Sequence, residues 1–392
     1  MAEILREFNN LKTKDKKNKK ELLTIGMTFI ILVLFSFFLH VYKDNQIVRL
    51  NYSNFEKIVD LTSSNFQSSA ITSSPIPLYG VIPESYQIKG GSHSFQTFNN
   101  CGPASLSMAL SFYCINVSQK ALGDELRPYQ IPNGDNDDKS VTLAELAEKS
   151  KDFGFIPFHR PVGTIEIVKK FVANNIPVIT RTLTKTNEDI GHFRVVYGYN
   201  DKRGYLIQND SLQGKGLKYD YDEFLQLWKP YGFEYLVLVK PGQEKLVGSI
   251  IGENIDEMIA WQNAVEYLKK EAVKNPEDKY LQFSLSVAYY EIGDCQKSIE
   301  IFEKVESKLP FRTLWYQIEP LLAYQKLGRY VELLPRIENI LNNGNRAFSE
   351  FYQIRGEIYL KQGRIEAARQ EFEKAIYYNK NFQPAQLSLE HL

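Results

Sequence analysis

The stretch QTFNNCGPASLSMAL, at residues 96–110, carries the strongest signal in this sequence. From position 102 onwards its apolar residues recur at helical spacing, which predicts an amphipathic helix over 102–115 with Cys101 immediately before it. Gly102 allows another segment to approach the backbone closely, and Pro103 suits the first helical turn. A cysteine at a helix N-terminus meets the positive end of the helix dipole, which stabilises the thiolate. Cys101 is therefore a candidate nucleophile.

The alternative for any cysteine is a structural role, because cysteine also serves as a small apolar core residue. Cys114, near the end of the same predicted helix, fits that description, and Cys295 is expected to be incidental in a later turn. Three scattered cysteines exclude a disulfide framework and a four-cysteine zinc site. The phosphate-loop, H-E-x-x-H and calcium-loop patterns are missing from the sequence, so we expect neither a cofactor nor a metal.

A cysteine nucleophile needs an imidazole to take its proton, and the chain has five histidines. Two of them lie in an apolar segment and in the C-terminal tail, and His159 falls in an expected loop. This elimination leaves His93 and His192. His192 opens the predicted strand 192–199, whose alternation fixes the direction of its side chain. His192 is the candidate general base.

The next predicted strand, 205–208, runs into the sequence Asn209-Asp210. Two antiparallel strands joined by a short turn bring this end close to His192 in space. Either Asn209 or Asp210 can then hold the imidazole in the tautomer that accepts the thiol proton. Gln96, five positions before the cysteine, can donate its amide hydrogens to a developing oxyanion.

These motifs carry a resemblance. Q-x4-C-G-P-A-S, then G-H-F-x-V-V-x-G-Y, then N-D is similar to papain-like cysteine peptidases of the bacteriocin-processing type, which remove double-glycine leader peptides, and to their stand-alone branch. The resemblance implies a papain-like domain with Cys101 as nucleophile and His192 as general base. It further implies Asp210 as the orienting residue and Gln96 as the oxyanion donor.

The sequence departs from this family at three places. An Asp or Glu often precedes the family's cysteine, whereas Asn100 stands here. The family's glutamine usually precedes the cysteine by six positions, whereas the interval from Gln96 to Cys101 is five. The family's aspartate is commonly followed by proline, whereas Ser211 follows here. Asn209 therefore stays open as an alternative to Asp210.

The region 80–241 that contains these motifs has helical patterns first and strand patterns afterwards, which indicates an α+β domain. The predicted elements are helices at 102–115, 142–152 and 164–174 and strands at 177–183, 192–199, 205–208 and 234–240. Thr142 and Glu145 form a T-x-x-E capping box at the start of the second helix.

The C-terminal region, 254–385, is helical and repetitive. Gly293, Gly328 and Gly363 are spaced 35 residues apart, and a tyrosine precedes each glycine by four positions. Large apolar residues follow at equivalent positions: Phe302, Ile337 and Phe372. This pattern resembles tetratricopeptide repeats, which stack into an all-α solenoid that binds proteins. An ordinary helical bundle is the alternative.

The N-terminal region contains an apolar run at 22–42, 21 residues long, which is about the length that crosses a bilayer. Six lysines crowd the basic segment 1–21, so the positive-inside rule places the N-terminus in the cytoplasm and the peptidase domain outside it. A linker, 43–79, follows and includes a Ser/Thr-rich tether. A cleaved signal peptide is the alternative to this single-pass anchor.

Composition agrees with a folded protein of several domains. The 392 residues carry 47 basic and 47 acidic side chains, so the zero net charge excludes a bulk nucleic-acid binder. We therefore expect a membrane-anchored cysteine peptidase that hydrolyses peptide bonds, with a peptide or protein substrate and a protein partner on the repeats. Two alternatives remain: an inactive peptide-binding scaffold and a thiol-dependent acyl transferase of the same fold.

Overall fold

The structure is a computed structural model that describes residues 82–135 and 141–392. Three predicted segments lie outside these residues: the basic segment 1–21, the transmembrane helix 22–42 and the linker 43–79. Within the described ranges, no helix has both the length and the apolar character needed to cross a membrane.

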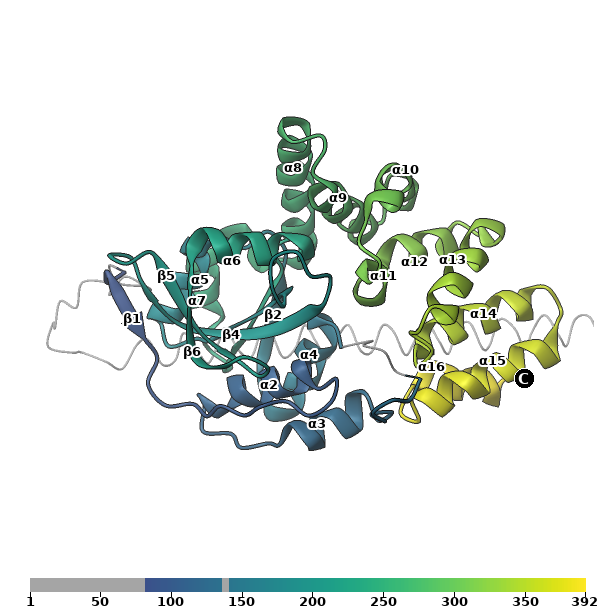
Figure 1. The fold of residues 1–392 in the computed structure, drawn as a ribbon, viewed down its shortest axis with the longest axis horizontal. Helices are drawn as coiled ribbons and strands as arrows, with labels where there is room; N and C mark the ends of the chain where they lie inside the picture. The colour runs from purple at the N-terminus through teal and green to yellow at the C-terminus, as the bar shows by residue number, and fades with distance from the viewer. Residues whose placement is uncertain (1–81, 136–140) are drawn as a thin grey trace, which may run out of the picture. The chain divides into compact units, whose positions relative to one another are not determined.

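An antiparallel sheet of seven strands organises the first region of the described chain (Figure 1). Six strands lie in the order β2-β7-β3-β4-β5-β6, and β1 pairs with the last residues of β4, beyond the part that β3 covers. The strands are β1 (Ser85–Gln87), β2 (Ile156–Arg160), β3 (Val178–Leu183), β4 (Gly191–Asn200), β5 (Tyr205–Asp210), β6 (Gly214–Asp220) and β7 (Tyr235–Val239). The predicted α+β class is confirmed.

Helices cover both faces of this sheet because its central strands alternate apolar side chains on both sides. The helices are α2 (Cys101–Ser111), α3 (Gln119–Leu126), α4 (Leu143–Ser150), α5 (Ile165–Ala173), α6 (Tyr221–Trp228) and α7 (Glu244–Ile251). On one face α2, α3 and α4 pack on Phe193 and Val195 of β4. On the other face α5, α6 and α7 pack on Val196. The predicted capping box of Thr142 and Glu145 begins α4.

Several elements were not predicted. His159 lies in β2 and not in a loop, so that expectation was wrong. Pro157 in the same segment argues against a strand, but β2 is the edge strand of the sheet, where a missing N–H is tolerated. Helix α7 lies beyond the expected end of the domain at residue 241. Its apolar side chains nevertheless belong to the core of the sheet domain.

The second region consists of helices, as predicted. They are α8 (Glu257–Lys274), α9 (Lys279–Glu291), α10 (Cys295–Val305), α11 (Thr313–Tyr316), α12 (Glu319–Lys326), α13 (Tyr330–Asn342), α14 (Ser349–Lys361), α15 (Ile365–Tyr378) and α16 (Gln383–Glu390). Neighbouring helices pair as hairpins, α9 with α10, α12 with α13 and α14 with α15 (Figure 1).

The three predicted glycines stand at the turn of each hairpin. Gly293, Gly328 and Gly363 have φ values of 84°, 70° and 73°, a conformation that side chains with a Cβ rarely adopt. In each turn the N–H of the following residue donates to the carbonyl of the tyrosine four positions before the glycine, at 2.8, 3.0 and 2.9 Å. The tyrosines are Tyr289, Tyr324 and Tyr359. The same C-terminal capping motif therefore closes the first helix of all three hairpins.

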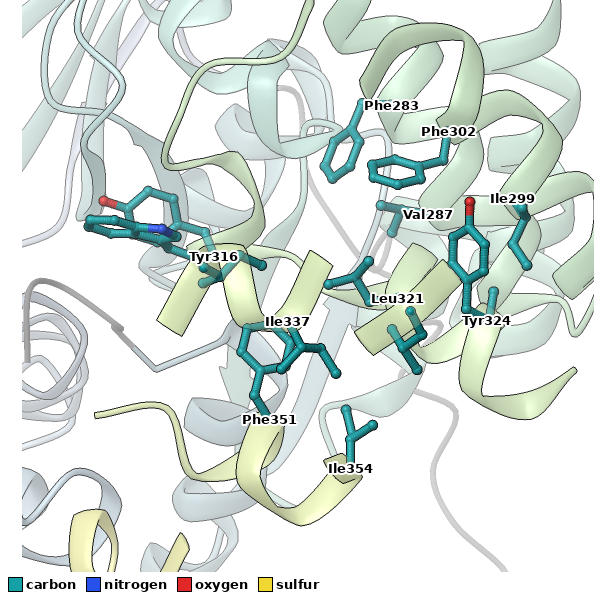
Figure 2. Close-up of a cluster of buried hydrophobic side chains, with 14 of the residues drawn as sticks. Phe283, Val287, Ile299, Phe302, Tyr316, Leu321, Tyr324, Ile337, Phe351 and Ile354 are labelled. Carbon is teal, nitrogen blue, oxygen red and sulfur yellow. The ribbon is translucent and has the colours of Figure 1, made fainter. Parts of the chain in front are cut away.

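The hairpins share a continuous apolar interior, part of which Figure 2 shows. The predicted seam residues Phe302, Ile337 and Phe372 are fully buried. Helix α13 contains Pro335 in its interior and continues through it. Stacking of this kind buries an apolar face that no single hairpin can bury alone.

Ion pairs connect the sheet domain with the repeats. Lys229 Nζ lies 2.6 Å from Asp278 Oδ2, and Arg312 Nη1 lies 2.8 Å from Asp189 Oδ1. The second pair involves the β3–β4 loop, three residues before His192.

Candidate active site

Cys101 is the first residue of α2, and its side chain is buried with an exposed fraction of 3%. The next residue must be glycine: a Cβ on Gly102 would lie 2.1 Å from Val141 and 3.4 Å from the ring of Phe193. Phe193 follows His192 directly on β4. The absence of a side chain at Gly102 therefore makes room for Val141, and the start of α2 lies near Phe193 of β4.

Asn100 precedes the helix, and its side chain does not cap it. The Asn100 Nδ2 donates instead to Thr97 Oγ1 at 2.7 Å. No side-chain oxygen at the cap position therefore competes for the amide groups of the first turn. These amides and the helix dipole favour negative charge on the Cys101 sulfur.

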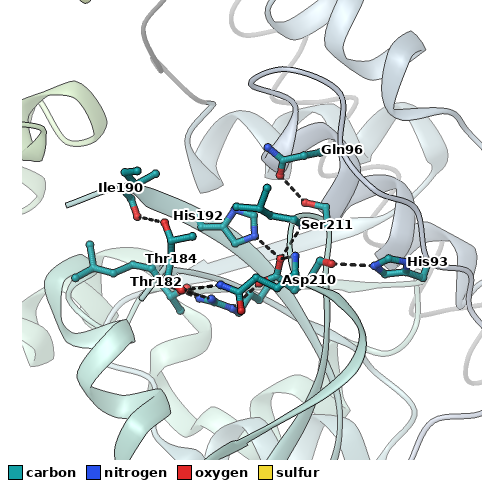
Figure 3. A network of polar contacts seen from close by, with 12 residues as sticks. His93, Gln96, Thr182, Thr184, Ile190, His192, Asp210 and Ser211 are labelled. Carbon is teal, nitrogen blue, oxygen red and sulfur yellow. Dashed lines mark hydrogen bonds and ion pairs between the residues drawn. The ribbon is translucent and has the colours of Figure 1, made fainter. Parts of the chain in front are cut away.

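His192 and Asp210 form a buried hydrogen bond (Figure 3). The His192 Nε2 donates to Asp210 Oδ1 at 2.8 Å, and both side chains are almost fully buried. Asp210 Oδ1 also accepts the backbone N–H groups of Leu212 and Gln213 at 2.7 and 2.8 Å. With Nε2 committed to the carboxylate, Nδ1 is the ring nitrogen that can exchange a proton with a thiol.

A β-bulge decides which of the two candidate orienting residues meets the ring. Near the turn, β4 and β5 pair as Asn200 with Tyr205, but the register shifts by one residue between Val196 and Gly198. After the shift, Arg194 pairs with Asp210, which puts Asp210 on the same face as His192. The side chain of Asn209 points the other way, and its Oδ1 accepts the N–H of Gly216 at 3.2 Å.

The charge state of this pair follows from its surroundings. Burial opposes ionisation of Asp210, but the hydrogen bond and charge of His192 and the charge of Arg194 outweigh burial and lower the pKa of Asp210 to about 2. For His192, burial lowers the pKa and the charge of Arg194 lowers it further, whereas Asp210 raises it. His192 is therefore poised to be neutral near pH 7, the form that accepts a proton.

Gln96 lies beside the aspartate end of the site (Figure 3). Its backbone N–H donates to the carbonyl of Ser211 at 2.7 Å, and the Ser211 hydroxyl donates to Gln96 Oε1 at 2.8 Å. The side-chain oxygen is thus held by Ser211, and the amide nitrogen carries the hydrogens that an oxyanion would need.

His93, the other histidine that elimination left open, supports the strand end. Its Nε2 donates to the backbone carbonyl of Asp210 at 2.8 Å, and its ring packs edge-on against Phe95. His93 and Asp210 lie 117 residues apart in the sequence, and no local pattern predicts such a contact.

The remaining cysteines differ from expectation in one case. Cys114 is exposed, lies beyond the end of α2 and has a φ of 62°. It is not an apolar core residue, because the helix ends at Ser111 and a left-handed turn carries the cysteine outwards. Cys295 is buried among the apolar residues of the repeats. Within residues 82–135 and 141–392, no cluster of three or more histidine, cysteine or acidic side chains is arranged to hold a metal ion.

Comparison with known proteins identifies the two regions. Residues 82–236 match the family described as Peptidase_C39 like, and residues 349–382 match the family described as Tetratricopeptide repeat. The first region is therefore a Peptidase_C39-like α+β domain, and tetratricopeptide-type helical repeats follow it. This agrees with the resemblance expected from the motifs.

A curated relative matches part of the chain. The TPR repeat-containing protein MJ1428 of Methanocaldococcus jannaschii is 27% identical over 127 residues, which is 30% of this chain and 22% of the relative. The chain thus matches less than a quarter of that protein's length.

Two solved structures are similar to the sheet domain. One is described as a C39-like peptidase from Bacillus anthracis, with 18% identity, 40% of this chain and 98% of that chain covered, and a TM-score of 0.35. The other is a double glycine motif protease from an AMS/PCAT transporter in complex with the leader peptide, with 19% identity, 39% and 93% covered, and a TM-score of 0.30.

Proposed function

We propose that this protein is a membrane-anchored cysteine peptidase that hydrolyses peptide bonds with Cys101, His192 and Asp210. The observation that carries the proposal is the buried 2.8 Å hydrogen bond from His192 to Asp210, on the strand against which the helix of Cys101 begins. A neutral imidazole with an oriented second nitrogen is what a cysteine nucleophile requires.

In the proposed reaction, His192 accepts the Cys101 proton and the thiolate attacks the carbonyl carbon of the scissile peptide bond. The oxyanion of the tetrahedral intermediate accepts hydrogen bonds from the Cys101 backbone N–H and the Gln96 amide. The imidazolium gives its proton to the leaving amine, and an acyl-enzyme remains. Water, deprotonated by His192, then releases the acid and restores the thiol.

Exposed apolar side chains flank every segment of the proposed site. Phe95 and Phe98 precede Cys101, Ile190 precedes His192, and Leu212 follows Asp210. Large apolar groups in water are usual at surfaces that bind another chain. We therefore propose an extended peptide with apolar residues near the cleavage position as the substrate. The helical repeats would bind a protein partner, which is the common use of such solenoids.

The membrane anchor is part of the proposal and rests on the apolar run 22–42 and the lysines before it. Protease added outside intact cells should cut the chain within the Ser/Thr-rich stretch of the predicted linker 43–79. Protection of this stretch in intact cells, together with cleavage after permeabilisation, would place the peptidase domain in the cytoplasm instead.

The test of the peptidase uses the full chain in detergent and a peptide library. Cys101→Ala should abolish cleavage, a fall of more than about 1,000-fold, whereas Cys114→Ala, which removes the exposed cysteine, should leave activity unchanged. In the Cys114→Ala background, iodoacetamide should label Cys101 well below the free-thiol pKa of about 8.5.

Each other outcome identifies an alternative. Labelling of Cys101 only near the pH of an ordinary thiol, with no cleavage of any peptide, would favour an inactive peptide-binding scaffold. Peptide products that carry an added amine, such as hydroxylamine, in place of water would favour an acyl transferase.

A further inference from the structure

Arg194 is a fully buried guanidinium two residues after His192 on β4. Its Nη1 donates to the backbone carbonyl of Leu183 at 2.7 Å and to the hydroxyl of Thr182, and its Nη2 donates to the carbonyl of Thr184 at 2.8 Å. The end of β3 thus shields the guanidinium from solvent. The ring of Tyr219 stacks on the guanidinium with its centroid 5.2 Å away.

The remaining nitrogen of Arg194 faces the aspartate of the proposed triad. Nε lies 2.9 Å from Asp210 Oδ2, as an ion pair whose N–H is not aligned for a hydrogen bond. The other carboxylate oxygen, Oδ1, accepts the hydrogen bond from His192. Asp210 is therefore shared between two cation-forming side chains, one on each oxygen.

A buried charge at this position is not explained by packing. The rest of β4 is largely apolar, and an isolated guanidinium would cost several kcal/mol to bury unless it is paired. A β-branched side chain would fill a central strand at no such cost. The pairing partner is also the only carboxylate that contacts His192 among the described residues.

We propose that Arg194 is a positioning residue that holds the second oxygen of Asp210 and sets the pH range over which His192 exchanges a proton with Cys101. This inference rests on the proposed function, since it concerns the same triad. Arg194 touches neither substrate nor the reacting atoms in this role. It acts through Asp210.

The direction of the effect follows from the charges that face the imidazole. These are Asp210 on β5 and Arg194 on β4, and His93, on the loop before α2, binds the Asp210 carbonyl. The strand β3 contributes the hydroxyl of Thr182, the residue that pairs with His192, and the guanidinium of Arg181, which stacks on the ring of Phe193 with the centroid 5.1 Å away. Burial is the main cause that lowers the pKa of His192, and the positive charge of Arg194 lowers it further by offsetting part of the negative charge of Asp210. Without Arg194, both the imidazolium and the protonated thiol are favoured.

The test compares Arg194→Gln, which removes the charge, with Arg194→Lys, which keeps it. In Arg194→Gln, the acidic and alkaline limbs of the kcat/KM profile should both move to higher pH, by about one unit for a charge this close. In Arg194→Lys, the limbs should stay at the wild-type pH while kcat/KM falls, because lysine lacks the forked donors that bind two carbonyls. The imidazole C–H resonance of His192 should report the same upward shift in Arg194→Gln.

A purely structural Arg194 would give a different result. Both variants would then lose activity and thermal stability with unmoved limbs and an unmoved His192 titration, and this result would overturn the inference. If Arg194→Gln does not fold, Thr182→Val removes one acceptor of the guanidinium. It should produce a smaller shift of the same sign, and an unmoved titration in that variant would also overturn the inference.

The His192 titration separates this inference from the proposed function. Wild-type protein that cleaves no peptide, but whose His192 titration moves in Arg194→Gln, would refute the peptidase and leave the role of Arg194 intact. A wild-type protein that cleaves peptides, with a His192 titration that does not move in Arg194→Gln, would support the peptidase and refute the role of Arg194.

Discussion

The sheet domain and the helical repeats bury polar side chains in different ways. In the sheet domain most of these side chains gather where β3, β4 and β5 lie side by side: Thr180, Arg181, Thr182, Thr184, His192, Arg194, Gln208, Asn209, Asp210 and Ser211. In the repeats the buried polar side chains are spread over several helices and the loops between them: Ser284, Ser286, Ser298, Gln317, Asn345, Ser349, Gln353, Glu371 and Asn379. The interior between them is apolar.

This difference distinguishes the sheet domain, which holds the proposed site, from the helical repeats. Burying a polar group is costly unless it is paired, and several of the isolated ones in the repeats are paired close by. Ser286 in α9, for example, donates to the backbone carbonyl of Ser298 at 2.6 Å. A concentration of buried charge on three adjacent strands has no such packing purpose. This group of side chains contains His192 and Asp210 of the proposed active site.

The junction between the two regions is the exception to this division. A cavity of about 120 Å³ is lined by Glu234 and Arg181 of the sheet domain and by Glu291 and Glu319 of the repeats. Burial, followed by the charges of neighbouring glutamates, raises the pKa of Glu291 to about 7 and that of Glu319 to about 8. One oxygen of Glu319 is buried without a hydrogen-bond partner.

The largest effect on stability is therefore expected at Glu319. The pKa of Glu319 in the folded protein, about 8, lies above the ordinary value of 4.5. The stability that the protonated side chain contributes is therefore fully present below pH 4.5 and is lost as the pH rises through about 8. Glu319→Gln should raise the free energy of unfolding by about 2 kcal/mol at pH 9, less than the full shift implies because the side chain is partly exposed. At pH 5 the same change should have little effect. Denaturant unfolding at both pH values measures the difference.

The control for this prediction is Glu373→Gln, which changes an exposed glutamate of α15. It should leave the pH dependence as in the wild type. A Glu319→Gln variant that is equally stabilised at pH 5 and pH 9 would contradict the prediction. It would show that the negative charge of Glu319 does not destabilise the junction.

The sequence was sufficient to predict that a histidine and an acidic residue meet on adjacent strands, but not which residue meets the ring. The choice between Asn209 and Asp210 depends on a single-residue shift of register at Val196 and Gly198. Without this bulge, the face of His192 would carry Asn209. A bulge depends on the packing of both strands and leaves no dependable sequence pattern.

The contacts of Arg194 and His93 with Asp210 were not predicted, for a related reason. Arg194 and His93 reach Asp210 across strands or from a distant loop, so their roles depend on tertiary register. The repeats were easier to predict. Each of their turns is closed by hydrogen bonds between residues five apart or fewer, so the Tyr-x3-Gly spacing contains almost all the information that the turn needs.

The smallest effects are expected at the repeat glycines, where the similar turns predict the same cost for alanine in each hairpin. A Cβ on Gly293, Gly328 or Gly363 would meet no atom within 4 Å, so the cost of alanine is the cost of a positive φ alone. Each Gly→Ala change should lower the free energy of unfolding by about 1 kcal/mol without changing activity. Gly248→Ala in α7, where φ is not positive, is the matched control and should be neutral or stabilising by up to about 1 kcal/mol. Denaturant titration of the four variants tests this. Costs that differ among the three turns by more than about 1 kcal/mol would mean that the hairpins are not equivalent units, because local backbone strain alone cannot distinguish them.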